Sequence, residues 1–234
     1  MNRFPRLYAI VDRATLDARS PQRASSPGAP RGLKVKGFAR ELREAGVRLV
    51  QYRDKVNGPQ EILRAANEID EAFEGAEVTR IMNDRADLAV LAGWDGVHVG
   101  QGDLGVEAVR RVLNSRGSIE RGPSKSGVAG LVGISTHNEE QVGAAIESGP
   151  DYVAVGPVFA TASKANADPV VGLELVRLTR AMTKLPIVAI GGITLANARS
   201  VMEAGADSVA VIGGLFAEGR TVREVARDFL EVLG

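Results

Sequence analysis

The sequence predicts an α/β protein that folds as a single-domain (β/α)8 barrel, and three observations favour this class. Short apolar runs alternate with amphipathic helical patterns along the whole chain. The segments 91–100, 147–156 and 203–213 share one cassette: a helical pattern ends near Gly, an acidic residue follows, and an apolar run closes on Gly. The length of 234 residues is also close to the roughly 250 that are typical of the class.

Eight apolar runs are expected as strands. Four come from these cassettes and from a looser copy at 43–55, and they cover residues 49–53, 96–100, 152–158 and 208–212. The other four lie between helical patterns, at residues 7–12, 79–83, 130–135 and 187–190. Helices are expected at residues 37–45, 59–74, 84–92, 105–115, 138–148, 172–183, 195–204 and 221–233. Repeated helix-to-strand units imply parallel strands with crossover helices, and eight of them favour a closed barrel over an open doubly wound sheet.

One segment after the first strand falls outside this alternation. Residues 18–36, ARSPQRASSPGAPRGLKVK, are rich in Ser, Pro, Gly and Arg. They follow a strand on the side of a barrel that carries the active site. We therefore expect one domain over residues 1–234 with this segment as an insertion, which is either a lid or a disordered loop.

Composition excludes several classes of function. The 29 basic and 29 acidic side chains cancel, so no net field favours nucleic acid or an anionic membrane as a partner. The chain has no cysteine, which excludes disulfides, thiol catalysis and cysteine-ligated metals. No signal peptide and no apolar run of about 18 residues is evident. We expect a cytoplasmic protein that acts on small molecules, and a homo-oligomer remains open.

A pair of cations lies at the end of the second expected strand. Since strand side chains alternate, Gln51, Arg53 and Lys55 share one face. In a barrel this face points to the mouth, where two cations suit a phosphate or pyrophosphate. The alternative is a solvated strand end.

Two carboxylates follow the next two strands. Asp84 comes directly after the third expected strand and Asp103 follows the fourth. Each can be a helix N-cap, because Asp is favoured there. Close to Arg53 and Lys55, however, two carboxylates on adjacent strands describe a Mg²⁺ site, since this ion prefers hard oxygen ligands beside phosphate.

A second candidate anion site follows the last three strands. Glycine pairs at 191–192 and 213–214 allow backbone amides to approach an anion, although tight turns also need glycine. The loops after strands 7 and 8 are the usual phosphate site of such barrels. After the sixth strand, Thr161, Ser163 and Lys164 add two hydroxyls and an ammonium. This combination also suits an oxyanion.

Together these motifs resemble the thiamine phosphate synthase family over residues 7–216. The matching segments are residues 51–55, 83–89, 96–104, 133–137, 151–174 and 189–193. Their order and spacing are specific, although each motif alone is weak. The resemblance implies a TIM-barrel transferase that joins 4-amino-5-hydroxymethyl-2-methylpyrimidine diphosphate to 4-methyl-5-(2-hydroxyethyl)thiazole phosphate and releases pyrophosphate.

The resemblance also implies a role for each matched position. Contacts to pyrophosphate are implied for Arg53, Lys55, Asn83 and Lys164, of which the three cations are the expected catalytic residues. Mg²⁺ ligation is implied for Asp84 and Asp103. Contacts to the aminopyrimidine are implied for Gln51 and Ser135, with His98 nearby. Contacts to the thiazole phosphate are implied for Thr161, Ser163, Gly192, Ile212 and Gly213.

The chain departs from the family pattern at two of these positions. Ser163 replaces the usual Thr and keeps the hydroxyl, whereas Gly213 replaces the usual Ser and removes a side-chain contact to the thiazole phosphate. Two alternative functions are a thiazole tautomerase and a non-catalytic phosphate-binding barrel. Neither needs both Asp84 and Asp103, so their presence favours the synthase.

Overall fold

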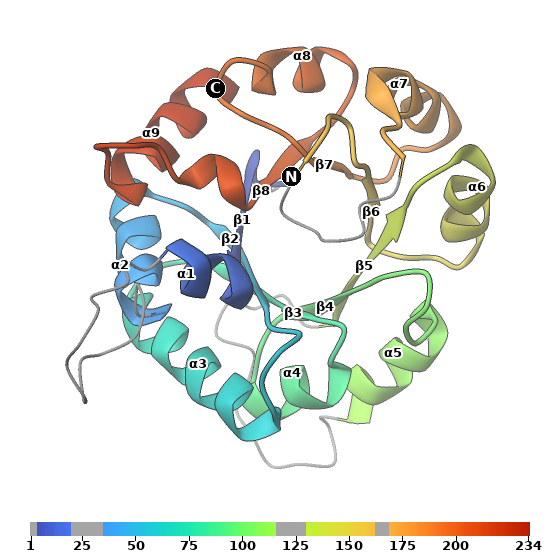
Figure 1. Cartoon of the computed structure of the whole chain (residues 1–234). Coiled ribbons are helices and arrows are strands. Elements are labelled where there is room, and N and C mark those ends of the chain that lie inside the picture. The colour runs from blue at the N-terminus through green and yellow to red at the C-terminus, as the bar shows by residue number, and fades with distance from the viewer. Residues whose placement is uncertain (1–3, 20–34, 116–129, 162–168) are drawn as a thin grey trace.

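Eight parallel strands close into a barrel in which the order around the circle is the order along the chain (Figure 1). This computed structural model describes residues 4–19, 35–115, 130–161 and 169–234. The strands are β1 (Leu7–Asp12), β2 (Leu49–Arg53), β3 (Thr79–Asn83), β4 (Gly96–Val99), β5 (Leu131–Thr136), β6 (Tyr152–Val155), β7 (Ile187–Ile190) and β8 (Ser208–Val211). Parallel pairing of β1 with β8 completes the closure. The predicted single-domain barrel is therefore confirmed.

Helices form the outer layer around the strands, except for the first helix, which lies inside this ring at the mouth of the barrel (Figure 1). They are α1 (Arg13–Arg19), α2 (Val35–Ala45), α3 (Pro59–Ala72), α4 (Ala86–Ala92), α5 (Val106–Asn114), α6 (Glu139–Glu147), α7 (Gly172–Met182), α8 (Ala198–Glu203) and α9 (Val222–Leu233). A short 3-10 helix, η2 (Gly213–Leu215), follows β8. Within the described ranges, none of these helices combines the length and apolarity that crossing a membrane requires.

The predicted strand bounds agree with the structure to within one residue, except at β6. This strand ends at Val155 rather than at residue 158. Pro157 has no N–H to donate to a ladder, so regular pairing stops before it. The amide of Val158 still donates to the carbonyl of Ile190 over 2.9 Å, which keeps the loop after β6 next to β7.

Helix α1 was not predicted, and it shortens the expected insertion. The Asp12 carboxylate accepts hydrogen bonds from the amide and the hydroxyl of Thr15, at 2.8 and 2.7 Å, as an N-cap residue does. The first two residues of the predicted insertion 18–36 belong to α1, and its last two begin α2. Residues 20–34 lie outside the described part of the chain.

Side chains alternate between the barrel interior and the helix layer, as the period of two predicts. On β2, Leu49 belongs to the interior cluster, whereas Val50 and Tyr52 pack in the cluster between strands and helices. Phe4 precedes β1 and packs against Tyr152 of the interior, with ring centroids 5.4 Å apart. The amino end of the barrel is thereby filled, and the polar side chains gather at the carboxyl end.

Candidate active site

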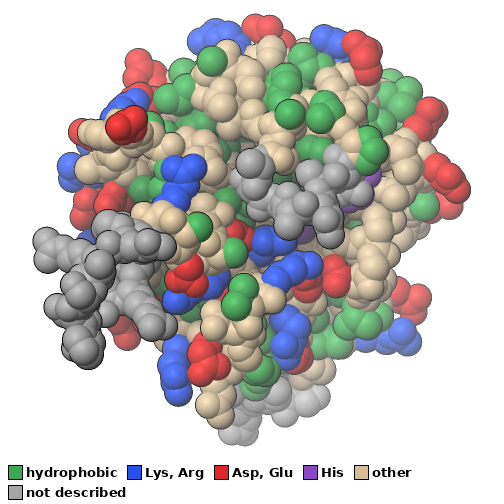
Figure 2. Space-filling model, viewed as in Figure 1, with side chains coloured by type: hydrophobic (Ala, Val, Ile, Leu, Met, Phe, Trp, Pro, Cys, Tyr) green, Lys and Arg blue, Asp and Glu red, His purple; other side chains and the backbone are tan. Residues whose placement is uncertain are grey.

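Two adjoining cavities lie at the carboxyl ends of the strands. The larger has a volume of about 290 Å³ and is bounded mainly by β5 to β8 and the loops that follow them. The smaller, about 40 Å³, lies in the barrel interior. The two share the lining residues Ser135, Ala154, Ile190, Ala210 and Ile212. Figure 2 shows Lys, Arg, Asp and Glu side chains close together near the middle of this face.

Glycines shape the wall of the larger cavity. Gly191 and Gly192 both have positive φ, 99° and 64°, a conformation that side chains with a Cβ adopt reluctantly. A Cβ on Gly192 would also stand 2.4 Å from the carbonyl oxygen of Ala160. The amide of Phe159 donates to the carbonyl of Gly191 over 3.0 Å. This close approach brings the loop that carries Thr161 against the turn after β7.

The sequence-predicted residues divide between the two cavities. The smaller one is lined by Gln51, Arg53, Asn83, His98 and Ser135, so the predicted inward face is confirmed for Gln51 and Arg53, whereas Lys55 follows the end of β2 and lines neither cavity. The larger one is lined by Ser135, Thr161, Gly192, Ile212 and Gly213. Ser163 and Lys164 lie outside the described residues. Apart from Lys55, and from Ser135 and Ile212, which line both cavities, the described residues expected at the pyrimidine diphosphate line the smaller cavity and those expected at the thiazole phosphate line the larger one.

A chain of buried hydrogen bonds crosses the barrel interior between Gln51 and Ser135. Gln51 Nε2 donates to the hydroxyl of Tyr8 over 2.9 Å, and that hydroxyl lies 3.0 Å from the hydroxyl of Tyr152. His98 continues the chain, with Nδ1 3.0 Å from the Tyr152 hydroxyl and Nε2 2.8 Å from Ser135 Oγ. Burial raises the pKa of both tyrosines above the usual range, so both phenols stay protonated.

This chain of hydrogen bonds links the two side chains that the family resemblance assigns to the aminopyrimidine. It was not visible in the sequence, because its members come from five different strands. The space for Tyr152 depends on Gly133, where a Cβ would stand 2.0 Å from the ring. The pairing of Gly133 with Tyr152 on the neighbouring strand, a glycine opposite a large aromatic residue, was the one feature of the sequence that could have pointed to this chain of hydrogen bonds.

Arg53 is held by a buried carboxylate that the sequence analysis missed. Its guanidinium donates from Nη1 to Asp12 Oδ2 over 2.6 Å, and the Asp12 side chain is only 2% exposed. The other Asp12 oxygen caps α1 through Thr15. Asp12 is the last residue of β1, just as Asp84 directly follows β3. This position at the end of a strand is the sequence feature that could have identified Asp12 as a site residue.

Lys55, Asp84 and Asp103 form the predicted charged cluster. Lys55 Nζ lies 3.0 Å from Asp84 Oδ2. Burial raises the pKa of the Asp84 carboxyl, Lys55 opposes this rise, and the neighbouring Asp103 carboxyl adds to it. The Asp103 carboxylate is oriented by the amide of Gly100, which donates to it over 2.8 Å. The two carboxylates therefore share one charged environment.

Neither carboxylate serves as the helix cap that the sequence left open. The N-cap positions of α4 and α5 are Arg85 and Gly105. Asp84 instead adopts a positive φ of 60°, a strained conformation of the kind that is concentrated at functional sites. In the described ranges, no group of three or more His, Asp or Glu side chains is placed to hold a metal. A cation here would need further oxygen ligands from a substrate.

The chain matches one family of known proteins over most of its length. The family model described as thiamine monophosphate synthase matches residues 29–215. The thiamine-phosphate synthase of Koribacter versatilis is 47% identical over 231 residues, which are 99% of this chain and 97% of the relative. That of Chloroflexus aurantiacus is 37% identical over 212 residues, with 91% and 85% covered.

A solved structure agrees with these sequence relatives. The thiamine phosphate pyrophosphorylase from Pyrococcus furiosus superposes with a TM-score of 0.73 at 26% identity, and 97% of this chain and 95% of that chain are covered. The match therefore extends over the strands that carry both cavities. This chain belongs to the thiamine monophosphate synthase family.

Proposed function

We propose that this protein is a thiamine phosphate synthase, a transferase that couples the pyrimidine diphosphate to the thiazole phosphate and releases pyrophosphate. The main support is the division of the matched residues between two adjoining cavities. A donor and an acceptor that must react with each other need adjacent sites with a shared boundary. The partners are these two small molecules, and the setting is a cytoplasmic enzyme with one domain over residues 1–234.

The pyrimidine diphosphate fits the smaller cavity and the charged cluster at its mouth. Gln51 and Ser135 hydrogen-bond the aminopyrimidine, with His98 beside them. Arg53, Lys55 and Asn83 bind the diphosphate, and Lys164 joins them by the family pattern. Arg53 is already oriented by Asp12, so its remaining N–H groups are available to phosphate oxygens in a fixed direction.

Asp84 and Asp103 are the residues proposed to hold Mg²⁺. The donor set fits this ion, because both side chains are carboxylates with hard oxygen ligands and they lie in one charged environment. Two carboxylate ligands would leave positions open to oxygens of the diphosphate and to water. Bound there, Mg²⁺ supplies charge neutralisation for the departing pyrophosphate.

The chemistry requires electrostatic stabilisation rather than proton transfer. The bond between the pyrimidine methylene carbon and the diphosphate oxygen breaks, and its electron pair leaves with pyrophosphate. Arg53, Lys55 and Lys164 stabilise this developing polyanion. The ring nitrogen of the thiazole, held by Thr161, Ser163 and the backbone of Gly192, Ile212 and Gly213, then forms the new bond to the methylene carbon. Catalysis therefore depends on fixed charge and on alignment across the shared wall.

A coupling assay tests this function. The purified protein with Mg²⁺ and both phosphorylated substrates should form thiamine phosphate and pyrophosphate in equal amounts. A thiazole tautomerase would convert a thiazole phosphate isomer without consuming the pyrimidine diphosphate, and a phosphate-binding barrel would convert neither. Absence of product from a sample with a cooperative thermal transition would overturn the proposal.

A further inference from the structure

Arg19 brings a positive charge to the larger cavity from outside the strand-end loops. It is the last residue of α1, and its side chain lines the cavity together with Thr161, Gly192 and Gly213. Among the described residues that line this cavity, Arg19 is the one with a permanent charge. The other polar groups there are hydroxyls, backbone amides and the ring of His137.

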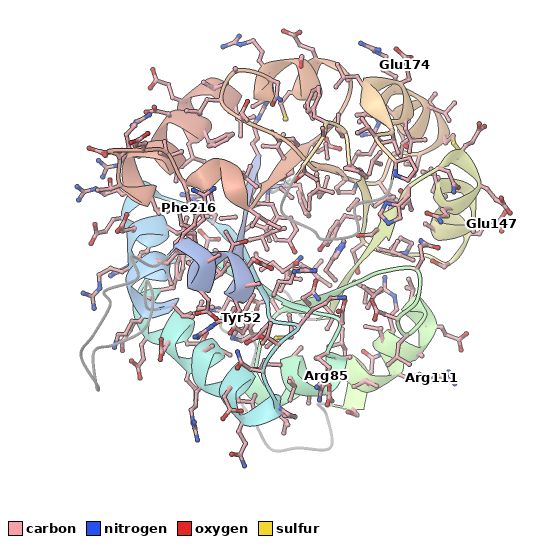
Figure 3. The ribbon with its side chains drawn as sticks, in the orientation of Figure 1. Tyr52, Arg85, Arg111, Glu147, Glu174 and Phe216 are labelled. Carbon is pink, nitrogen blue, oxygen red and sulfur yellow. The ribbon has the colours of Figure 1, made fainter. Side chains whose placement is uncertain are left out.

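The guanidinium of Arg19 has a fixed support. Its Cζ lies 4.8 Å from the centroid of the Phe216 ring, within the range of a cation–π contact. Phe216 directly follows η2, whose first two residues line the same cavity. It stacks in turn on Phe38 of α2, with centroids 5.4 Å apart, and Phe38 is 1% exposed. Figure 3 shows Phe216 beside α1.

This support leaves the hydrogen-bonding edge of Arg19 available. The N–H groups of a guanidinium lie in the plane of the group. When one face of the guanidinium rests on an aromatic ring, these N–H groups still point outward and can donate to two oxygens of one phosphate. Hydroxyls and backbone amides can hydrogen-bond a phosphate in this cavity, but they carry no full charge to offset the charge of the phosphate. A cation adds that charge, and Arg19 is positioned to supply it.

We propose that Arg19 binds the phosphate of the thiazole substrate and makes the enzyme select the phosphorylated acceptor over the corresponding alcohol. It would supply the side-chain contact that Gly213, with no side chain, does not offer. This inference rests on the proposed function and extends it to a residue on α1, outside the matched motifs.

Steady-state kinetics with two acceptors test the assignment. For Arg19→Ala, KM for the thiazole phosphate should rise about tenfold or more, as expected for loss of a charged hydrogen bond, while KM for the pyrimidine diphosphate stays unchanged. With the unphosphorylated thiazole alcohol as acceptor, kcat/KM should be the same in wild type and Arg19→Ala. Arg19→Lys should restore part of the selectivity, because it keeps the charge without the planar fork.

Arg13→Ala is the matched control. Arg13 lies on the same helix, pairs with Asp17 at 3.0 Å, and is absent from the lining of the larger cavity. Its substitution should leave the selectivity between the two acceptors unchanged. An equal fall in kcat/KM for both acceptors in Arg19→Ala would mean that Arg19 only supports the fold, and would overturn the assignment.

Calorimetric titration separates this inference from the proposed function. Thiazole phosphate and inorganic phosphate are titrated into wild type and Arg19→Ala without the second substrate, and the variant should bind both about tenfold more weakly. If wild type binds in this way yet forms no product, the proposed function fails and the assignment of Arg19 stands. If wild type forms product and the variant has unchanged KM and Kd, the assignment fails alone.

Discussion

Asp12 and Arg53, at the ends of two neighbouring strands, form a partly buried ion pair with a distance of 2.6 Å at the mouth of the barrel. One oxygen of Asp12 holds the guanidinium and the other caps α1. The same carboxylate therefore orients a proposed catalytic cation and begins the helix that carries Arg19.

Asp12→Asn should separate these two roles. Asn still accepts from the amide of Thr15, so α1 keeps its cap, but Arg53 loses its charged partner and its fixed direction. We expect kcat/KM for the pyrimidine diphosphate to fall about tenfold, which corresponds to about 1.4 kcal/mol. Arg53→Ala should cost more, about 2.7–4 kcal/mol, by analogy with loss of an oxyanion-hole donor.

Kinetics with each substrate varied in turn, together with thermal unfolding, check the Asp12 prediction. Asp12→Ala, which removes the cap as well, should also lower the melting temperature. Unchanged kcat/KM in Asp12→Asn would show that the ion pair contributes to the fold and not to substrate binding.

Asp103→Ala should abolish Mg²⁺-dependent turnover and leave the fold intact. Asp103 is exposed and is no helix cap, so its loss removes a proposed metal ligand and one hydrogen bond from the Gly100 amide in an exposed loop. Asp87→Ala is the control, because Asp87 is also exposed and pairs with Arg85 at 2.6 Å near the same rim. The test is to measure turnover of wild type and both variants as a function of Mg²⁺ concentration, with circular dichroism to check that each protein is folded. Equal Mg²⁺ responses in wild type and Asp103→Ala would contradict the metal site.

Tyr8→Phe should raise KM for the pyrimidine diphosphate and spare KM for the thiazole phosphate. The change removes the hydroxyl that accepts from Gln51 and leaves the ring that packs near Tyr152. Without this partner the Gln51 amide is free to turn away from the aminopyrimidine, and a several-fold effect is expected for one neutral hydrogen bond.

Tyr52→Phe is a control for the loss of a buried tyrosine hydroxyl. Tyr52 lies on the other face of β2, toward the helices, where its hydroxyl donates to Asp54 over 2.8 Å (Figure 3). Both variants should be slightly less stable, and only Tyr8→Phe should affect the pyrimidine diphosphate selectively. A shift of the same size in both would leave Tyr8 with a packing role alone.

Gly192→Ala should weaken binding of the thiazole phosphate. A Cβ at φ 64° is strained, and it would meet the Ala160 carbonyl at 2.4 Å, so the loop carrying Thr161 must move. The left-handed conformation alone costs about 1–2 kcal/mol. Gly37→Ala, in α2 with nothing within 4 Å of its added Cβ, should be neutral or stabilising. Titration with thiazole phosphate and thermal unfolding of both variants provide the measurement. Equal affinities of wild type and Gly192→Ala for thiazole phosphate would show that Gly192 does not shape the wall of the larger cavity in this way.

The sequence was sufficient for the barrel because each strand, and each helix apart from α1, carries a local signal. Patterns of apolar residues and glycine caps identified all eight strands, and four had the correct bounds at both ends. Helix α1 was missed because it is short and rests on a single cap, Asp12. The predicted β6 ends three residues too late, because the run of apolar residues continues past the point where Pro157 ends the pairing.

The candidate site was predicted less completely, for a physical reason. Strand alternation placed Gln51 and Arg53 inward, and position at strand ends brought Asp84 and Asp103 to one rim. Contacts between distant strands leave no such local trace. The pairing of Tyr8 with Tyr152 spans 144 positions, and the approach of Arg19 to Phe216 requires the closed barrel to exist.

The closed barrel also places most of the proposed donor-site and acceptor-site residues in different halves of the chain. Asp12, Arg53, Asp84 and Asp103 belong to β1 through the loop after β4, whereas the wall at Thr161, Gly192 and Gly213 follows β6, β7 and β8. Under the proposed function, changes in this wall can therefore adapt the protein to a different acceptor while Asp12, Arg53, Asp84 and Asp103 stay as they are. Lys164 and Arg19 are the proposed exceptions to this division, and Ser135 and its neighbours on the shared wall must suit both substrates.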